Sequence, residues 1–361
     1  MNVPDCTLTT CCYDLTKYHT KSRNLDETIN TMFSLLKVPC YLVIFTDEHC
    51  YDKINQIRTS FNLDHLTKYI VTKIEDLPFY RYIDVIKKNR EKYWPTKDER
   101  TCSESHMICC SKFNFVLETI ELNPFQTTKF GWIDSNIKIN FEKICENYNE
   151  EILLNILSNI NNKFHIQILN VTNKKFKNYD NKKEYYNNYR WVVGGCLFLT
   201  NKQLGIKILH RLNEIFIETT FLGYGHGEEM LYLEVLDEFY DDIERSYGDY
   251  NQILNNYFYP TKNIYYIYNN IIQNYLNYSY HKESYDCCKS VLQSIENNTI
   301  EYNMNIYMKI LYSYYMSSYY HNKTGKEAIQ YIYSLCEKNN ELLIEFNKNK
   351  EFYESQFKFC N

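Results

Sequence analysis

Three aspartates follow short apolar runs of this 361-residue chain, and each has the chemistry to bind a ligand. Asp14 follows CTLTTCCY, Asp47 follows CYLVIFT, and Asp134 follows KFGWI. Parallel sheets bind ligands at the carboxyl ends of their strands, where these aspartates are expected to lie. Asp134 begins an Asp-Ser-Asn turn, and its carboxylate with the amide oxygen of Asn136 predicts a site for a hard cation, Mg²⁺ or Mn²⁺. The alternative is that both side chains bind only the backbone of their own turn.

Glycine is scarce in this chain, yet seven of its nine glycines fall in four short segments. Trp132 and Trp191, two of its three tryptophans, lie in the same segments. Glycine is needed where the backbone takes a positive φ or comes close to a ligand, so the segments predict one shared pocket. Four tight turns are the alternative. The glycines are Gly131, Gly194, Gly195, Gly223, Gly225, Gly227 and Gly248.

Two glutamates follow the last glycine-rich loop and begin a predicted helix. Either Glu228 or Glu229 could act as the general base that deprotonates a hydroxyl. Acids in a first helical turn are also favourable on dipole grounds alone, which is the simpler interpretation. His226, directly before them in the loop, is a candidate third metal ligand or phosphate contact, with an ordinary loop histidine as the alternative.

The apolar spacing predicts the elements that must position these residues. The first 48 residues predict a β-α-β unit whose helix begins with a capping box of Asn24 and Glu27. Such units build parallel sheets, so we expect an α/β fold with a mainly parallel central sheet. Further expected elements are a helix from Ser111 to Leu122, strands at FGWI and HIQIL, and a strand WVVGGCLFLT broken by its glycine pair and followed by a helix capped by Thr200.

The composition and the apolar pattern of the sequence change near residue 262. Helix-like stretches separated by short polar joints follow one another, and glycine almost vanishes. This pattern predicts a C-terminal all-α helical-hairpin region at residues 262–361 behind an α/β domain at residues 1–261.

The order of these motifs resembles the HtrL/YibB-like family of GT-A-type glycosyltransferases. The resemblance spans roughly residues 8–258 and is carried by SKFNFVLETIELNPFQTTKFGWIDSNI, GGCLFLT, GHGEEMLYLEVL and GDYNQIL. It implies a GT-A-like, Rossmann-like nucleotide-diphospho-sugar transferase domain. The implied donor is a nucleotide-diphosphate sugar, most simply a UDP-sugar, and the implied acceptor is a hydroxyl of a glycan or glycoprotein.

The resemblance also implies roles for residues that match the family pattern. Lys112 would neutralise the donor's diphosphate, with Arg23 as a second phosphate candidate, while Asp14 and Asp47 would contact the base or ribose. GT-A enzymes usually supply an Asp-x-Asp metal motif, whereas this chain has Asp134-Ser135-Asn136. The predicted acceptor-binding residues are Trp191, Gly194, Gly195, Asp249 and Tyr250.

The composition excludes several other classes of protein. A net charge of −5 gives no global attraction to nucleic acid or to anionic membranes. The 14 cysteines include no C-x-x-C, which argues against zinc and thioredoxin-like sites and favours reduced thiols. With no evident signal peptide or membrane span, we expect a cytoplasmic protein.

Four alternatives stay open at this point. The altered Asp134 turn is compatible with a non-catalytic protein that acts as an interaction module through its helical tail. A nucleotidyltransferase is less favoured because no phosphate loop of Walker or Rossmann spacing is present, and a Cys-His hydrolase lacks a recognisable nucleophile motif. The basic stretch 173–190 is compatible with nucleic-acid binding or with a mobile lid over a donor.

Overall fold

The computed structural model describes residues 3–92, 98–135, 148–188, 190–224 and 227–358. The chain divides into two compact units. The α/β unit contains Met1–Gln167 and Lys175–Arg245, and the helical unit contains Ile168–Lys174 and Ser246–Asn361. No helix in the described ranges is long and apolar enough to cross a membrane.

Seven described strands form one sheet in the order β3-β2-β1-β4-β6-β5-β7. β1 pairs in parallel with β2 and β4, and β2 pairs in parallel with β3, whereas β6 is antiparallel to both β4 and β5. The strands are β1 (Cys6–Cys12), β2 (Tyr41–Thr46), β3 (Thr67–Val71), β4 (Lys129–Ile133), β5 (Phe164–Ile168), β6 (Leu197–Asn201) and β7 (Ile243–Tyr247).

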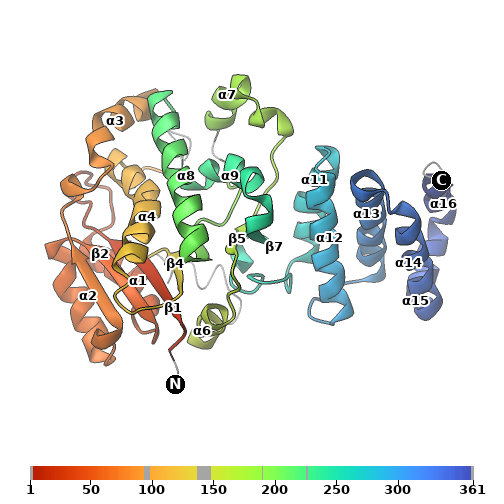
Figure 1. The fold of residues 1–361 in the computed structure, drawn as a ribbon, viewed down its shortest axis with the longest axis horizontal. Helices are drawn as coiled ribbons and strands as arrows, with labels where there is room; N and C mark the ends of the chain where they lie inside the picture. Colours follow the sequence, from red (N-terminus) through yellow and green to blue (C-terminus); the bar gives the residue numbers. More distant parts are fainter. Residues whose placement is uncertain (1–2, 93–97, 136–147, 189, 225–226, 359–361) are drawn as a thin grey trace. The chain divides into compact units, whose positions relative to one another are not determined.

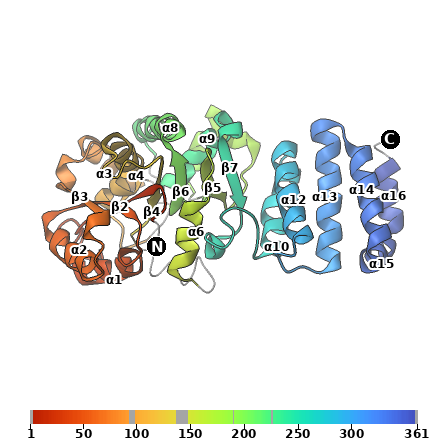
Figure 2. The ribbon, with the colours of Figure 1, turned by 60° about the horizontal axis from the view of Figure 1, so that its bottom comes forward.

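Helices cover both faces of this sheet. On one face α4 packs against α8 and against β1 and β4, and the Thr9 hydroxyl donates a hydrogen bond to Thr119 Oγ1 at 2.9 Å (Figure 1). Figure 2 shows α1, α2 and α6 on the opposite face. The helices are α1 (Leu25–Leu36), α2 (Glu48–Ser60), α3 (Ile83–Lys92), α4 (Ser103–Leu122), α6 (Glu150–Ser158), α7 (Lys182–Tyr186), α8 (Lys202–Phe221) and α9 (Tyr232–Glu238).

The predicted α/β class is confirmed: the chain has a mixed, mainly parallel central sheet with helices and a helical C-terminal region. The capping box of Asn24 and Glu27 is also present at the start of α1. Two local expectations were wrong. The cap of α8 is Asn201 and not Thr200, because the Asn201 side chain accepts the Leu204 N–H. The glycine pair also does not interrupt a strand, since β6 begins only after it.

The basic stretch after β5 contains helix α7 and is bound to the protein by ion pairs. Lys182 Nζ lies 2.5 Å from Glu234 Oε1, and Lys177 pairs with Asp237, so two of its lysines contact α9. Lys175 Nζ lies 2.8 Å from Glu184 Oε1 within the stretch itself. Three of the six basic residues that suggested a polyanion site or a mobile lid are therefore paired with carboxylates of this chain.

The helical unit consists of successive helices that pack on their neighbours in the sequence. α12 packs on α13, which in turn packs on α14 and α15. Its core is rich in aromatic rings, such as the stacked pair Phe346 and Tyr353 with centroids 5.6 Å apart. The helices are α10 (Ile264–Tyr266), a π-helical turn (Ile267–Ile272), α11 (Gln273–Asn277), α12 (His281–Glu296), α13 (Met304–Asn322), α14 (Gly325–Lys338), α15 (Asn340–Lys348) and α16 (Lys350–Lys358).

A buried arginine joins the end of α1 to the start of β2. Arg58 lies in the last turn of α2, is fully buried, and donates hydrogen bonds from Nη1 to the carbonyls of Leu36 and Val38 at 3.1 and 2.8 Å. Its Nη2 donates to the Cys40 carbonyl at 3.1 Å. The Leu36 carbonyl lies at the end of α1, where carbonyls lack intrahelical partners, and the Val38 carbonyl accepts the Cys40 N–H at 2.9 Å in addition to Arg58. This guanidinium therefore supplies donors that water would otherwise give.

We expect Arg58→Met to lower the free energy of unfolding by about 3 kcal/mol, because buried carbonyls lose their donors. Urea denaturation followed by circular dichroism measures this difference. The exposed Arg81→Met is the matched control and is expected to change stability by less than about 0.5 kcal/mol. Equal stability of the two variants would contradict the proposed role of Arg58.

His165 on β5 is held neutral in the folded protein. Its side chain is buried, and its Nε2 lies 2.6 Å from Asn161 Oδ1. Burial, together with the positive charges of Lys129 and Lys163, lowers the pKa of His165 to about 4. The unfolded chain therefore binds a proton near pH 6.5 that the folded protein takes up only near pH 4.

The free energy of unfolding is expected to fall as the pH drops from about 6.5 to about 4, by up to roughly 3 kcal/mol from this group. Below that window both states carry the proton, so the loss from His165 stops. His165→Gln keeps a hydrogen-bonding amide and should flatten the curve in that window. The measurement is urea denaturation at closely spaced pH values, and an unchanged slope in the variant would refute the assignment.

Candidate functional site

One edge of the sheet collects most of the residues predicted to form a site. The carboxyl ends of β1, β2 and β4 lie at the same edge because these strands are parallel, and the amino end of β6 joins them because β6 runs the other way. The turn before β6 is fixed there by two hydrogen bonds. Asp134 N–H donates to the Cys196 carbonyl, and Gly194 N–H donates to the Gln167 carbonyl, both at 2.9 Å.

Lys112 of α4 lies at the centre of this edge and is 1% exposed. Its ammonium donates to Asp134 Oδ1 at 3.2 Å, to the Gly195 carbonyl at 3.0 Å and to Glu228 Oε1 at 2.5 Å. A lysine ammonium has three N–H donors, so these three acceptors match its full capacity. We call Lys112, Asp134, Gly195 and Glu228 the lysine cluster.

The charge of Lys112 is stabilised by its carboxylate partners. Burial alone would lower the pKa of Lys112, but Asp134 and Glu228 outweigh it and hold that pKa well above its usual range. Both carboxylates are less exposed than a surface acid, with side-chain exposures of 29% for Asp134 and 8% for Glu228. The cluster is thus a buried ion pair in which the ammonium stays charged at any physiological pH.

Trp132 is a further partner of the cluster. It lies two residues before Asp134 on β4, so the strand alternation directs both side chains to the α4 face. Its indole Nε1–H donates to Asp134 Oδ1 at 2.5 Å, and Lys112 Nζ lies 5.4 Å from the centroid of its ring. The indole therefore fixes the same carboxylate oxygen that the ammonium binds and adds a cation–π contact.

Gly195 is required by the protein's own glutamates. Glu228 and Glu229 begin a 3₁₀ turn, η6 (Glu228–Leu231), that leads into α9. A Cβ at position 195 would lie 2.9 Å from Glu229 Cγ and 3.1 Å from Glu228 Oε1. The absent side chain thus lets both glutamates approach the backbone before β6, and the predicted closeness of these two glycine-marked segments is present in the structure.

A second group of polar contacts lies after β1 and β2. Asp47 accepts the Asp14 N–H at Oδ2 (2.8 Å) and the Cys50 N–H at Oδ1 (2.9 Å), so it also caps α2. Asp14 Oδ1 accepts from the Thr16 N–H at 2.9 Å, and its Oδ2 lies 3.5 Å from His49 Nε2. The two aspartates predicted at neighbouring strand ends are therefore in direct contact.

The remaining predicted residues are not among the contacts of the lysine cluster. Arg23 is half-buried in the loop before α1, where burial and the nearby Arg100 lower its pKa. Trp191 is 56% exposed ahead of the glycine pair. Asp249 belongs to the helical unit, where it accepts a hydrogen bond from Asn263 Nδ2 at 2.6 Å, and Tyr250 is its neighbour in that unit. The two other predicted metal ligands, Asn136 and His226, lie outside the described residues.

The described donor groups do not by themselves fit a divalent cation. No group of three His, Cys, Asp or Glu side chains with a metal-binding arrangement occurs among the described residues. Asp134 Oδ1, the predicted first ligand, already accepts N–H groups from Lys112 and Trp132. A cation would have to compete with a buried ammonium for this oxygen, so we derive no step through a metal.

Two contributors to the site were not predicted from the sequence. Trp132 was noted only for its position among glycines, although its spacing of two from Asp134 on a strand already places both on one face. Tyr232 is fully buried and lies close enough to Lys112, Glu228 and Glu229 to interact with their charges. Its hydroxyl has no hydrogen-bond partner among the described residues, and burial raises its pKa. Nothing in the local sequence separates this tyrosine from the 36 others.

The chain is similar to one protein family and, distantly, to solved structures. The model of a family described as "Bacterial protein of unknown function (HtrL_YibB)" matches residues 4–221. Among solved structures, mouse xyloside xylosyltransferase 1 in its apo form matches with 12% identity and a TM-score of 0.35, covering 70% of this chain and 93% of that chain. The search of curated proteins gives no match.

We expect Gly195→Ala to destabilise the protein by roughly 1–3 kcal/mol, because the new methyl group would overlap with the Glu229 side chain. The double variant Gly195→Ala/Glu229→Ala removes the overlapping atoms and should recover part of that loss. Urea denaturation of wild type, both single variants and the double variant measures the coupling. Additive losses would show that the two residues do not contact each other as described.

Proposed function

Because the chain belongs to the HtrL/YibB family, we propose that it is a glycosyltransferase that moves a sugar from a nucleotide-diphosphate sugar to a hydroxyl acceptor. The observation that carries this proposal is the gathering of acidic side chains at the carboxyl-end edge of a mainly parallel sheet. That edge is where open α/β sheets bind nucleotides. The UDP-sugar and the glycan or glycoprotein acceptor named from the resemblance are part of the proposal.

The donor's nucleoside is assigned to the contact between Asp14 and Asp47. Carboxylates at the ends of neighbouring parallel strands can accept hydrogen bonds from ribose hydroxyls. Asp14 offers Oδ2 for this purpose: its Oδ1 accepts from Thr16, whereas the described residues give Oδ2 only the long contact of 3.5 Å with His49. Arg23, in the same half of the unit, is the proposed contact for a phosphate.

The acceptor is assigned to the glycine pair and to the exposed ring of Trp191. In the proposed reaction the acceptor oxygen forms a bond to the anomeric carbon, and the bond from that carbon to the diphosphate oxygen breaks. The nucleoside diphosphate leaves with the bonding electrons. Glu229 is proposed to take the hydroxyl proton because it lies beside the glycine pair to which the acceptor is assigned: its Cγ would be 2.9 Å from a Cβ at position 195.

A second candidate function is a non-catalytic interaction protein. The observation in its favour is that both acids of the lysine cluster already pair with an ammonium of the protein, which has no donor left for a ligand. Exposed apolar side chains of the helical unit, such as Ile344 and Phe352, would then provide the contact surface. Hydrolysis or transfer of a nucleotide sugar separates the two functions.

We expect one nucleoside diphosphate of the set UDP, GDP, CDP and ADP to raise the thermal midpoint of the wild-type protein. At 100 times its Kd a ligand stabilises by about 2.7 kcal/mol, which thermal denaturation detects readily. The matching nucleotide sugar should be hydrolysed or transferred, and Glu229→Gln should lower that rate at least tenfold while the nucleotide still binds. Each measurement is made with and without Mn²⁺, which tests the Mn²⁺ or Mg²⁺ site predicted from the sequence.

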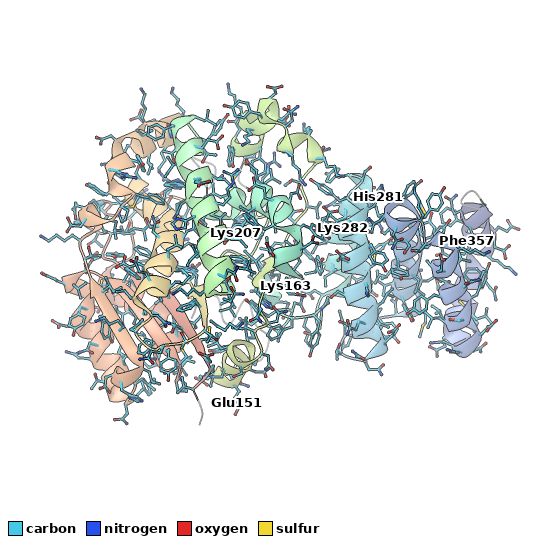
Figure 3. All side chains as sticks on the ribbon, viewed as in Figure 1. Glu151, Lys163, Lys207, His281, Lys282 and Phe357 are labelled. Carbon is cyan, nitrogen blue, oxygen red and sulfur yellow. The ribbon has the colours of Figure 1, made fainter. Side chains whose placement is uncertain are left out.

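Glu151→Gln serves as the matched control. Glu151 is an exposed glutamate at the start of α6, and Figure 3 shows it at the periphery of the molecule. This variant should keep wild-type binding and rate. Absence of a thermal shift with all four nucleotides, together with absence of hydrolysis of their sugars, would overturn the transferase and favour the interaction protein.

A further inference from the structure

The buried ammonium of Lys112 is saturated by acceptors of the protein itself. Its three contacts of 3.2, 3.0 and 2.5 Å use all the N–H groups that a lysine has. At 1% exposure, the side chain offers almost no surface to a ligand. Binding a phosphate would require Lys112 to release a carboxylate or a carbonyl, and that group would remain buried without its partner.

The acceptors come from segments that are distant in the chain. Asp134 follows β4, Gly195 precedes β6, and Glu228 begins η6, while Lys112 itself lies on α4. The sequence separations from Lys112 are 22, 83 and 116 residues. One ammonium therefore joins four elements at the edge where the donor and acceptor are proposed to meet.

Removing this charge would leave like charges together. Asp134 and Glu228 would face each other and the Gly195 carbonyl across a buried space with no cation between them. Repulsion would then move η6, and with it Glu229, whose Cγ is held close to Gly195. The position of Glu229, the proposed proton acceptor, thus depends on Lys112 through Gly195 and Glu228.

We propose that Lys112 is a positioning residue, which holds Asp134, Gly195 and Glu228 together before any ligand arrives and does not itself bind the donor's phosphates. That Lys112 does not bind the donor's phosphates rests on the proposed function, whereas its role in holding the three residues together does not. It replaces the role of diphosphate neutralisation that the family resemblance implied for this lysine.

The first experiment is a double-mutant cycle of Lys112→Met, Glu228→Gln and the double variant. Removing one partner of a buried ion pair is strongly destabilising, whereas removing both is tolerated far better. Lys112→Met is expected to lower the thermal midpoint by roughly 10 °C, and the double variant should recover at least half of that loss. Lys207→Met, an exposed lysine on α8 (Figure 3), is the matched control and should change it little.

A spectroscopic readout separates positioning from general loosening. In a background with Trp94→Phe and Trp191→Phe, Trp132 is the single tryptophan, and its indole contacts both Asp134 and the Lys112 ammonium. Its emission should shift in Lys112→Met well below the unfolding temperature, and Lys207→Met should leave it unchanged. If Lys112→Met does not fold, folded protein from the double variant with an altered emission is the supporting result. An unaltered emission, or no recovery in the double variant, overturns the positioning role.

The second experiment addresses the phosphates. The ratio of the Kd of UMP to the Kd of UDP reports contacts to the second phosphate and is insensitive to a uniform loss of affinity. We expect Lys112→Met, or the double variant in its place, to keep this ratio within twofold of wild type, whereas a tenfold fall would show that Lys112 binds the diphosphate. If wild-type protein binds no nucleotide, the proposed function fails, while the stability cycle and the Trp132 emission still decide the positioning role.

Discussion

The arrangement of the α/β unit depends on the burial of one positive charge. An ammonium removed from water is stable only when its N–H groups find acceptors and its charge finds carboxylates. Lys112 finds Asp134, Glu228 and the Gly195 carbonyl, each from a different element. α4, the end of β4, the turn before β6 and the start of η6 must therefore meet at one point, and the strand order with an antiparallel β6 makes this possible.

Local features of the fold could be predicted because their causes lie within a few residues. The capping box of Asn24 and Glu27, the buried strands β1 and β2, and the aspartates that follow them all depend on short-range spacing. The same reasoning failed at α8, where two neighbouring polar residues compete for one cap. Asn201 takes it because its Oδ1 reaches the Leu204 N–H, and the preceding threonine hydroxyl donates to the Asn201 carbonyl instead.

Three residues of the lysine cluster could be singled out from the sequence, but their contacts could not be predicted. The sequence marks Lys112, Asp134 and Glu228, yet a lysine on a helix carries no sign that its partners lie 22 and 116 residues away. Gly195 illustrates the same limit. Its lack of a side chain predicts a close approach, and the atoms that approach it in the structure are those of Glu228 and Glu229. A ligand and a neighbouring side chain both need the space that a Cβ would fill, so a glycine in the sequence does not tell which of them is present, and only the structure distinguishes them.

The charge balance of the site limits where a donor's phosphates can lie. When Asp134, Glu228 and Glu229 are ionised, three carboxylates surround the single ammonium of Lys112, and the site carries a net negative charge. A diphosphate adds further negative charge and is repelled from the lysine cluster unless positive charge arrives with it or lies nearby. Burial and the nearby Arg100 lower the pKa of Arg23, while Arg100 itself is paired with Asp98, its Nη2 lying 2.7 Å from Asp98 Oδ2. The three N–H groups of Lys112 are already bound within the protein, so a diphosphate finds no unpaired positive charge on that ammonium, and the charge balance agrees with the proposed phosphate contact at Arg23 instead.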